Sequence, residues 1–355
     1  MRLRSLDILR GLDLWLLLMV GPLLRVVFNV WEPQSQTFQW ISSQLHHVDW
    51  EGFTLWDIIM PLFMFMSGIT IPFSMRRFKG SPDRNFYLRL LKRFSLLFLC
   101  GWIVQGNILS FEIDRFHVFS NTLQAIAVGY VASALIYVHF RPRNQIIIIS
   151  GLFLAYLLAF VFTGMNLDPE TNVAMMVDEV VLGRFRDGTQ YTWILSSLNF
   201  IVTVMLGCLA GQIVREGGDE ATSQKAWVMA LTGAGLVAAG LLMSLFFPII
   251  KKIWSSSMTL YSGGICFLLM AAVYYLVDVR KVWKGSDWLL FFGTNSIAAY
   301  MLGKAVDLSS VTESLLYGFE HLTPEIYPLV LVAGEVLLLF LILRHMYRKN
   351  IFLKL

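Results

Sequence analysis

Apolar segments of membrane-spanning length recur along the whole chain, and they limit the possible folds more than any other feature. A helix needs about 20 mostly apolar residues to cross a bilayer. About ten segments approach that length: 8–28, 55–75, 94–109, 123–138, 146–162, 194–214, 226–247, 260–277, 288–306 and 326–343. Charged residues make up 15% of the chain, against about 25% in soluble domains. The sequence therefore predicts an all-α polytopic membrane helix bundle, organised as a single domain over residues 1–355.

The Lys and Arg residues are unevenly distributed between the loops. Cytoplasmic loops of membrane proteins carry an excess of these residues. If both termini are cytoplasmic, most of the 28 basic residues fall on the inner side. The exceptions are Arg25, Arg115, Arg184, Arg186, Lys251, Lys252 and Lys304. This pattern predicts cytoplasmic termini and places the stretch 45–61 outside. The net charge of +4 is too small to indicate a nucleic-acid partner.

Ionisable residues crowd into the stretch 45–61, at the mouth of the second expected span. His47 is the candidate general base, because a neutral imidazole can accept a proton near pH 7. Asp49, Glu51 or Asp57 could hold its tautomer. The alternative is an interfacial histidine that is hydrogen-bonded within a loop. We expect no metal site, because adjacent histidines are poorly spaced for one and the cysteines are remote in sequence.

Other polar residues have both a structural and a functional interpretation. Asp7 and Arg10 are three residues apart and therefore share one helix face. They could form an ion pair at the membrane surface, or Arg10 could contact a phosphate. Lys251 lies in an outer loop, either solvated or contacting substrate. Three polar side chains lie within the expected spans: Gln124, Asn295 and Ser296. Such side chains either join helices or line a cavity.

Basic residues are concentrated in the inner segment 76–93. Membrane topology and anionic lipid headgroups explain most clusters of this kind. The functional interpretation is that the segment docks a polyanionic cytosolic cofactor.

Several segments, in order along the chain, resemble one known family. The opening 3–11 (LRSLDILRG) is similar to the start of the catalytic membrane domain of the heparan-α-glucosaminide N-acetyltransferase family. The segment 47–52 (HVDWEG), followed by Asp57, Pro61 and Gly68, resembles that family's H-x-x-W-x-G…D…P…G stretch. Further similar segments are 122–126 (TLQAI), 172–178 (NVAMMVD), 247–255 (FPIIKKIWS) and 292–296 (FGTNS).

The resemblance implies a transmembrane N-acetyltransferase that transfers an acetyl group from cytosolic acetyl-CoA to an amino sugar on the outer side. It implies that His47 is the active-site histidine, and we assign Asp49 and Asp57 to it as catalytic partners. The donor would contact Asp7, Arg10, Gln124, Asn295 and Ser296. The amino-sugar or glycan acceptor would contact His46, Trp50, Glu51, Asp178 and Lys251.

The sequence also supports expectations about location and leaves some alternatives open. No N-x-S/T sequon occurs, which favours a location in a bacterial cytoplasmic (inner) membrane. Membrane lipid is then an expected partner. Homodimerisation is left open. Transfer could be direct or could proceed through an acetyl-histidine intermediate. The rival function is a transporter or flippase for a sugar or lipid-linked sugar, and the lack of an internal repeat counts against it.

Overall fold

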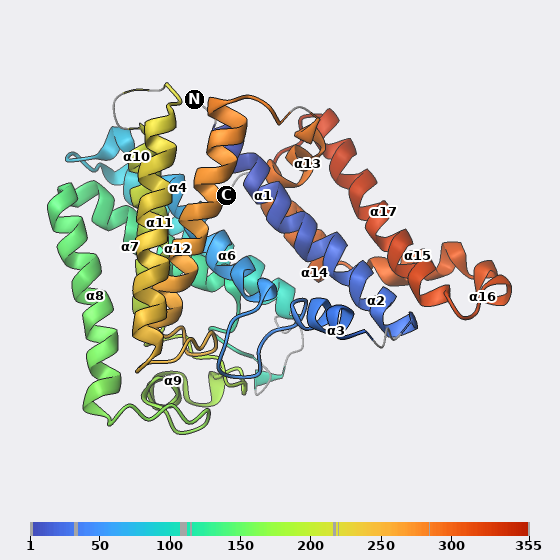
Figure 1. The fold of residues 1–355 in the computed structure, drawn as a ribbon, viewed down its shortest axis with the longest axis horizontal. Helices are drawn as coiled ribbons and strands as arrows, with labels where there is room; N and C mark the ends of the chain where they lie inside the picture. The colour runs from blue at the N-terminus through green and yellow to red at the C-terminus, as the bar shows by residue number, and fades with distance from the viewer. Residues whose placement is uncertain are drawn as a thin grey trace.

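The computed structural model describes residues 3–31, 35–106, 112–113, 116–215, 218, 220–283 and 285–353. These residues form a bundle of helices (Figure 1). The α-helices are α1 Arg4–Trp15, α2 Gly21–Trp31, α3 Gln36–Ser43, α4 Ile59–Ile69, α5 Ile71–Ser74, α6 Arg84–Gln105, α7 Thr122–His139, α8 Pro142–Phe162, α9 Val173–Leu182, α10 Ser197–Arg215, α11 Ser223–Ser244, α12 Ser256–Tyr274, α13 Leu289–Gly293, α14 Ser296–Ala305, α15 Leu308–Leu316, α16 Gly318–Leu322 and α17 Tyr327–Arg348. Among the described residues, β-type pairing is limited to one antiparallel bridge between Glu51 and Ile250.

Eight of the described helical segments are long and apolar enough to cross a membrane. They are Arg4–Trp31, Leu55–Ser74, Thr122–His139, Pro142–Phe162, Ser197–Arg215, Ser223–Ser244, Ser256–Val279 and Tyr327–Arg348. Each corresponds to one of the expected spans. The chain is therefore an all-α integral membrane protein, as the hydropathy pattern predicts.

The two remaining expected spans have a different character. Of the segment 94–109, residues 94–105 belong to α6, whose first half carries Arg84, Arg89, Lys92 and Arg93, and residues 107–109 lie outside the described part of the chain. The segment 288–306 is divided into α13 and α14, because the backbone of Asn295 leaves the helical region (φ −119°, ψ 39°). A broken helix in a membrane protein is tolerated where its free backbone groups are buried in protein or line a cavity.

Asn295 also holds the end of the described chain. Its Nδ2 donates to the carbonyl of Ile351 (2.8 Å), and its Oδ1 accepts from the N–H of Leu353 (3.1 Å). Leu353 and Leu3 line the same cavity. Both ends of the described chain thus lie on one side of the bundle, which is compatible with termini that share one membrane face.

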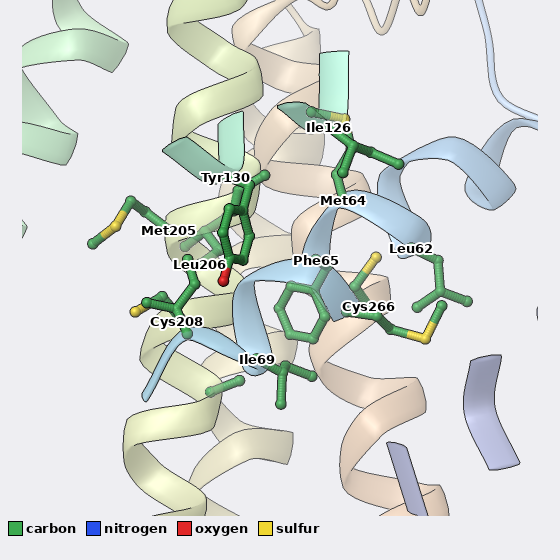
Figure 2. Close-up of a cluster of buried hydrophobic side chains, with 14 of the residues drawn as sticks. Leu62, Met64, Phe65, Ile69, Ile126, Tyr130, Met205, Leu206, Cys208 and Cys266 are labelled. Atoms are coloured by element: carbon green, nitrogen blue, oxygen red, sulfur yellow. The ribbon is translucent and has the colours of Figure 1, made fainter. Parts of the chain in front are cut away.

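Helix α4 lies in the middle of the bundle and packs on α7, α10 and α12. Figure 2 shows its side chains Leu62, Phe65 and Ile69 among buried neighbours from those helices. Two glycines allow the backbones of α4 and α10 to touch. A Cβ on Gly68 would lie 1.9 Å from the carbonyl oxygen of Val204, and one on Gly207 would lie 1.9 Å from that of Phe65.

We expect Gly68→Ala to lower the free energy of unfolding by on the order of 3 kcal/mol, because its methyl group would collide with rigid backbone. The matched control is Gly235→Ala on α11, where a Cβ meets nothing within 4 Å. That variant should be neutral or slightly stabilising, since alanine favours a helix over glycine. Thermal unfolding in detergent compares the two variants. Equal melting temperatures would contradict the close α4–α10 contact.

Candidate active site

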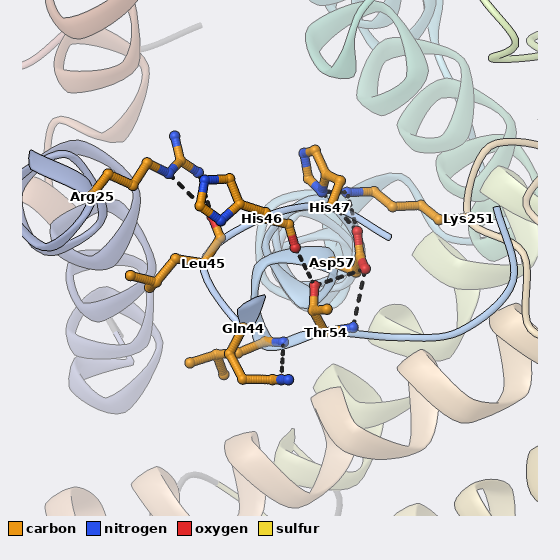
Figure 3. A network of polar contacts seen from close by, with 9 residues as sticks. Arg25, Gln44, Leu45, His46, His47, Thr54, Asp57 and Lys251 are labelled. Atoms are coloured by element: carbon orange, nitrogen blue, oxygen red, sulfur yellow. Dashed lines mark hydrogen bonds and ion pairs between the residues drawn. The ribbon is translucent and has the colours of Figure 1, made fainter. Parts of the chain in front are cut away.

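His47, Asp57 and Lys251 meet at one carboxylate oxygen (Figure 3). His47 Nδ1 lies 2.7 Å from Asp57 Oδ1, and Lys251 Nζ lies 3.2 Å from the same oxygen. The side chain of Asp57 is 1% exposed and that of Lys251 is 9% exposed, whereas that of His47 is 44% exposed. Asp57 and Lys251 therefore form a buried ion pair, and the accessible imidazole of His47 contacts the same carboxylate.

The local sequence around Asp57 explains its orientation. Thr54 and Asp57 form a capping box at the start of the helical turn Leu55–Ile58, which leads into α4. The Thr54 N–H donates to Asp57 Oδ2 (3.1 Å), and the Thr54 hydroxyl lies 2.9 Å from the same oxygen. Reciprocal capping of this kind satisfies backbone donors at a helix start. It leaves Oδ1 facing His47 and Lys251.

Lys251 arrives from a loop that is hydrogen-bonded on both sides of it. The Gly52 N–H donates to the carbonyl of Ile249 (2.9 Å), and the Thr192 N–H donates to the carbonyl of Lys252 (3.0 Å). Lys251 is thus fixed by the loop that carries His47 and by the long connection before α10. Burial lowers the pKa of Lys251, and the Asp57 carboxylate opposes that shift.

The contacts also define which nitrogen of His47 is free. A carboxylate can only accept hydrogen bonds, so the 2.7 Å contact assigns the proton to Nδ1. Lys251 Nζ lies 3.1 Å from Nδ1, but an ammonium can only donate, so its hydrogen bond goes to Asp57. In the neutral imidazole Nε2 then carries the lone pair, which is what a general base needs.

His47 lines a cavity of about 660 Å³, which we call the outer cavity because the sequence predicts that this end of the bundle faces outward. Three cations, Arg25, Lys251 and Lys304, line it together with one acid, Asp187. Tyr191 also faces this cavity, and burial together with nearby Asp57 and Asp187 raises its pKa to about 12. Its phenol therefore stays a neutral hydrogen-bond donor.

A second cavity of about 510 Å³ lies toward the chain ends, and we call it the inner cavity because the sequence predicts cytoplasmic termini. Asp7, Arg10, Arg93 and Ser296 line it. Asp7 and Arg10 are 3.7 Å apart as an i,i+3 pair on α1. Along α1 and α2, the path from Asp7 to Arg25 covers about 27 Å at the usual helical rise. Asp7 in one cavity and Arg25 in the other are therefore separated by roughly the thickness of a bilayer core.

The other predicted site residues occupy different surroundings. His46 lines the outer cavity, and its Nδ1 lies 3.0 Å from the carbonyl of Ser42. Asp49 and Glu51 are exposed and do not line this cavity. Trp50 packs beside the apolar cluster around Phe247.

Gln124 and Asp178 are buried and bind backbone. Gln124 Oε1 accepts from the Ser120 N–H (2.8 Å), and its Nε2 donates to the carbonyl of Val118 (3.1 Å). Asp178 accepts the N–H groups of Trp193 (2.7 Å) and Ile194 (2.8 Å). Together with Asn295, these side chains hold chain segments in place, and neither cavity is lined by them.

Asp178 gives the folded protein a pH dependence. Burial raises its pKa to about 6, which outweighs the two backbone donors that favour the charged form. The folded state thus binds this proton more tightly than the unfolded chain, whose carboxyl has a pKa near about 3.9. Stability should fall by about 3 kcal/mol as the pH rises through the window from about 4 to 6. Asp178→Asn should lack this slope. Melting temperatures in detergent across this range test it, and parallel curves for the two proteins would contradict it.

Sequence reasoning missed Thr54, Arg25 and Tyr191. The T-x-x-D spacing of a capping box, residues 54–57, was the available signal for Thr54. It also distinguishes Asp57 from Asp49 and Glu51 as the partner of His47. Arg25 donates from Nε (3.1 Å) and Nη2 (2.6 Å) to the carbonyl of Leu45, and no local pattern indicates that contact.

Two curated proteins are similar to this chain. Heparan-alpha-glucosaminide N-acetyltransferase from Homo sapiens is 24% identical over 425 aligned positions, which cover 99% of this chain and 60% of the human protein. The Mus musculus protein of the same name is 30% identical over 113 residues, or 30% of this chain and 17% of the mouse protein. The chain thus spans about three fifths of the human relative's length. No family model matches the chain.

Proposed function

We propose that this chain, a distant relative of heparan-α-glucosaminide N-acetyltransferase, is a membrane-embedded acetyltransferase that uses acetyl-CoA to acetylate an amino sugar. One observation carries the proposal. An accessible imidazole, oriented by a buried carboxylate, lines one of two cavities that lie at opposite ends of the same helices. This arrangement suits a reaction whose two substrates come from opposite sides of a membrane.

The inner cavity is the proposed donor path. Coenzyme A carries several phosphates on a nucleotide and ends in a long, thin pantetheine arm. The basic segment 76–93 would hold the phosphates, and Arg10 and Arg93 line the cavity. Asp7 and Ser296 line the same cavity. The arm would then extend toward the outer cavity and place the thioester near His47.

Direct transfer is the proposed chemistry. His47 Nε2 accepts a proton from the acceptor amine while the amine nitrogen forms a bond to the thioester carbonyl carbon. Asp57 stabilises the resulting imidazolium, and the Tyr191 phenol is the proposed donor to the oxyanion. The carbon–sulfur bond then breaks. The imidazolium returns its proton to the leaving thiolate, so that CoA departs as the free thiol.

The charges in the outer cavity would act on an amine acceptor. Arg25 and Lys304 outnumber the single acid Asp187 in its lining, while Lys251 is paired with Asp57. Positive neighbours disfavour a charged ammonium, so a bound amine would be held as the neutral nucleophile. The outward orientation of this cavity and the bacterial inner membrane remain predictions of the sequence, and homodimerisation remains open.

The test is transfer of labelled acetyl from acetyl-CoA to a panel of sugars that end in glucosamine, with purified protein in detergent or in native membranes. Wild type should form acetylated product, and His47→Ala should not. CoA binding without transfer to any sugar of the panel would refute the amino-sugar acceptor. Failure to bind CoA would refute the acyltransferase and favour the transporter or flippase.

A further inference from the structure

The inner and outer cavities meet at three shared residues. Phe63 on α4, Thr122 at the start of α7 and Tyr300 on α14 line both cavities. Every other lining residue belongs to only one of these two cavities. These three side chains, from three helices, therefore form the boundary between the donor side and the His47 side.

The boundary consists of two aromatic rings and one hydroxyl. Phe63 is partly buried and packs against apolar clusters on both sides of α4. Tyr300 interacts with the side chain of Thr122 across the boundary. Phe63 stands on the central helix α4, which glycine contacts fix against α10. Tyr300 stands on the short helix that follows the break at Asn295. One ring is thus held on the rigid centre and the other on a broken segment.

We propose that Phe63 and Tyr300 form a gate that determines which acyl group is transferred. This inference rests on the proposed function. A thioester that reaches His47 from the inner cavity must bring its acyl group past these two rings. An acetyl group adds one methyl there, whereas a butyryl group adds two further methylenes that would meet the rings. A misfit of one methylene in an apolar pocket changes kcat/KM by about 10- to 200-fold.

The gate also separates the thioester from outer water. With the rings closed on the donor, water has poor access to the carbonyl carbon before an acceptor is bound. Loss of either ring should therefore have two effects: a broader choice of acyl group and a faster acceptor-independent hydrolysis of acetyl-CoA, which yields acetate and CoA.

The experiment measures kcat/KM for acetyl-, propionyl- and butyryl-CoA with one fixed amino-sugar acceptor. Phe63→Ala and Tyr300→Ala should raise the butyryl-to-acetyl ratio by about tenfold or more. Tyr300→Phe keeps the ring and should keep the wild-type ratio. The matched control is Phe73→Ala, because Phe73 lines the inner cavity but not the outer one, and its ratio should also stay at the wild-type value.

The outcomes separate the gate from the proposed function. Wild type that transfers no acetyl group overturns both. Active wild type with an unchanged ratio in Phe63→Ala and Tyr300→Ala overturns the gate alone, as does an equal change in Phe73→Ala. If an alanine variant does not fold, Phe63→Leu removes the ring while retaining bulk. Its hydrolysis of acetyl-CoA without acceptor should exceed that of wild type, and an unchanged rate would refute the gate.

Discussion

Replacing His47 with alanine is expected to lower kcat for acetyl transfer by about 10³-fold, within the range for loss of a general base. The imidazole lines the outer cavity, and its partner Asp57 is buried. CoA binding should be unaffected, because the inner cavity does not include His47. Radiolabelled transfer measures the first quantity and calorimetric titration with CoA the second.

The neighbouring histidine provides the matched control. His46 lines the same cavity, but its Nδ1 contacts the carbonyl of Ser42 rather than a carboxylate. His46→Ala should change KM for the acceptor and leave kcat within about tenfold of wild type, since it removes binding contacts rather than a proton acceptor. Equal losses of kcat in both variants would argue against His47 as the base.

Replacing Asp57 with asparagine is expected to affect both stability and rate. The amide is neutral, so the Lys251 ammonium would remain buried without its counter-charge, and breaking a buried pair in this way costs about 3–5 kcal/mol. The amide can also present its NH₂ group to His47, which would favour the tautomer with a proton on Nε2. An analogous change in the serine-protease triad lowers kcat by about 10⁴-fold, and we expect a loss of about 10³-fold or more here.

A double variant separates the two effects. Asp57→Asn combined with Lys251→Met removes both charges and should recover much of the lost melting temperature, because no unpaired ion stays buried. Its activity should remain as low as that of Asp57→Asn. Recovery of activity along with stability would show that Asp57 acts only through folding. Failure to recover stability would mean that the ammonium is not the cause of the loss.

The features that sequence predicts well here are those determined by composition over many residues. Apolar length was sufficient to predict the membrane bundle, since spans such as Pro142–Phe162 are apolar throughout. It was less informative for the segment 288–306, because the break at Asn295 depends on tertiary hydrogen bonds to Ile351 and Leu353. The sequence named Asp57 together with Asp49 and Glu51, and local spacing could have singled out Asp57, whose capping box with Thr54 lies within four residues.

Contacts between distant segments could not be predicted in the same way. The sequence suggested Lys251 as a substrate contact, which stays a prediction, but it did not indicate that Lys251 also pairs with Asp57 beside His47, which is 204 positions away. Gln124 and Asp178 are fully buried polar residues, as functional residues of membrane proteins often are. Both instead bind backbone groups of neighbouring loops. Burial alone therefore did not separate residues that hold the fold from residues that line the cavities.

The separation of Asp57 and Lys251 along the chain has a consequence for biogenesis. Asp57 begins the second membrane segment and is synthesised long before Lys251, so the carboxylate must enter the membrane region without its ammonium partner. Until then, its stabilising contacts are local ones with Thr54 and His47. Closing so long a loop is entropically costly and slow. The complete three-residue unit therefore forms late, after helix insertion, and a chain interrupted before Lys251 would carry an unmatched charge in a bundle that is otherwise largely apolar.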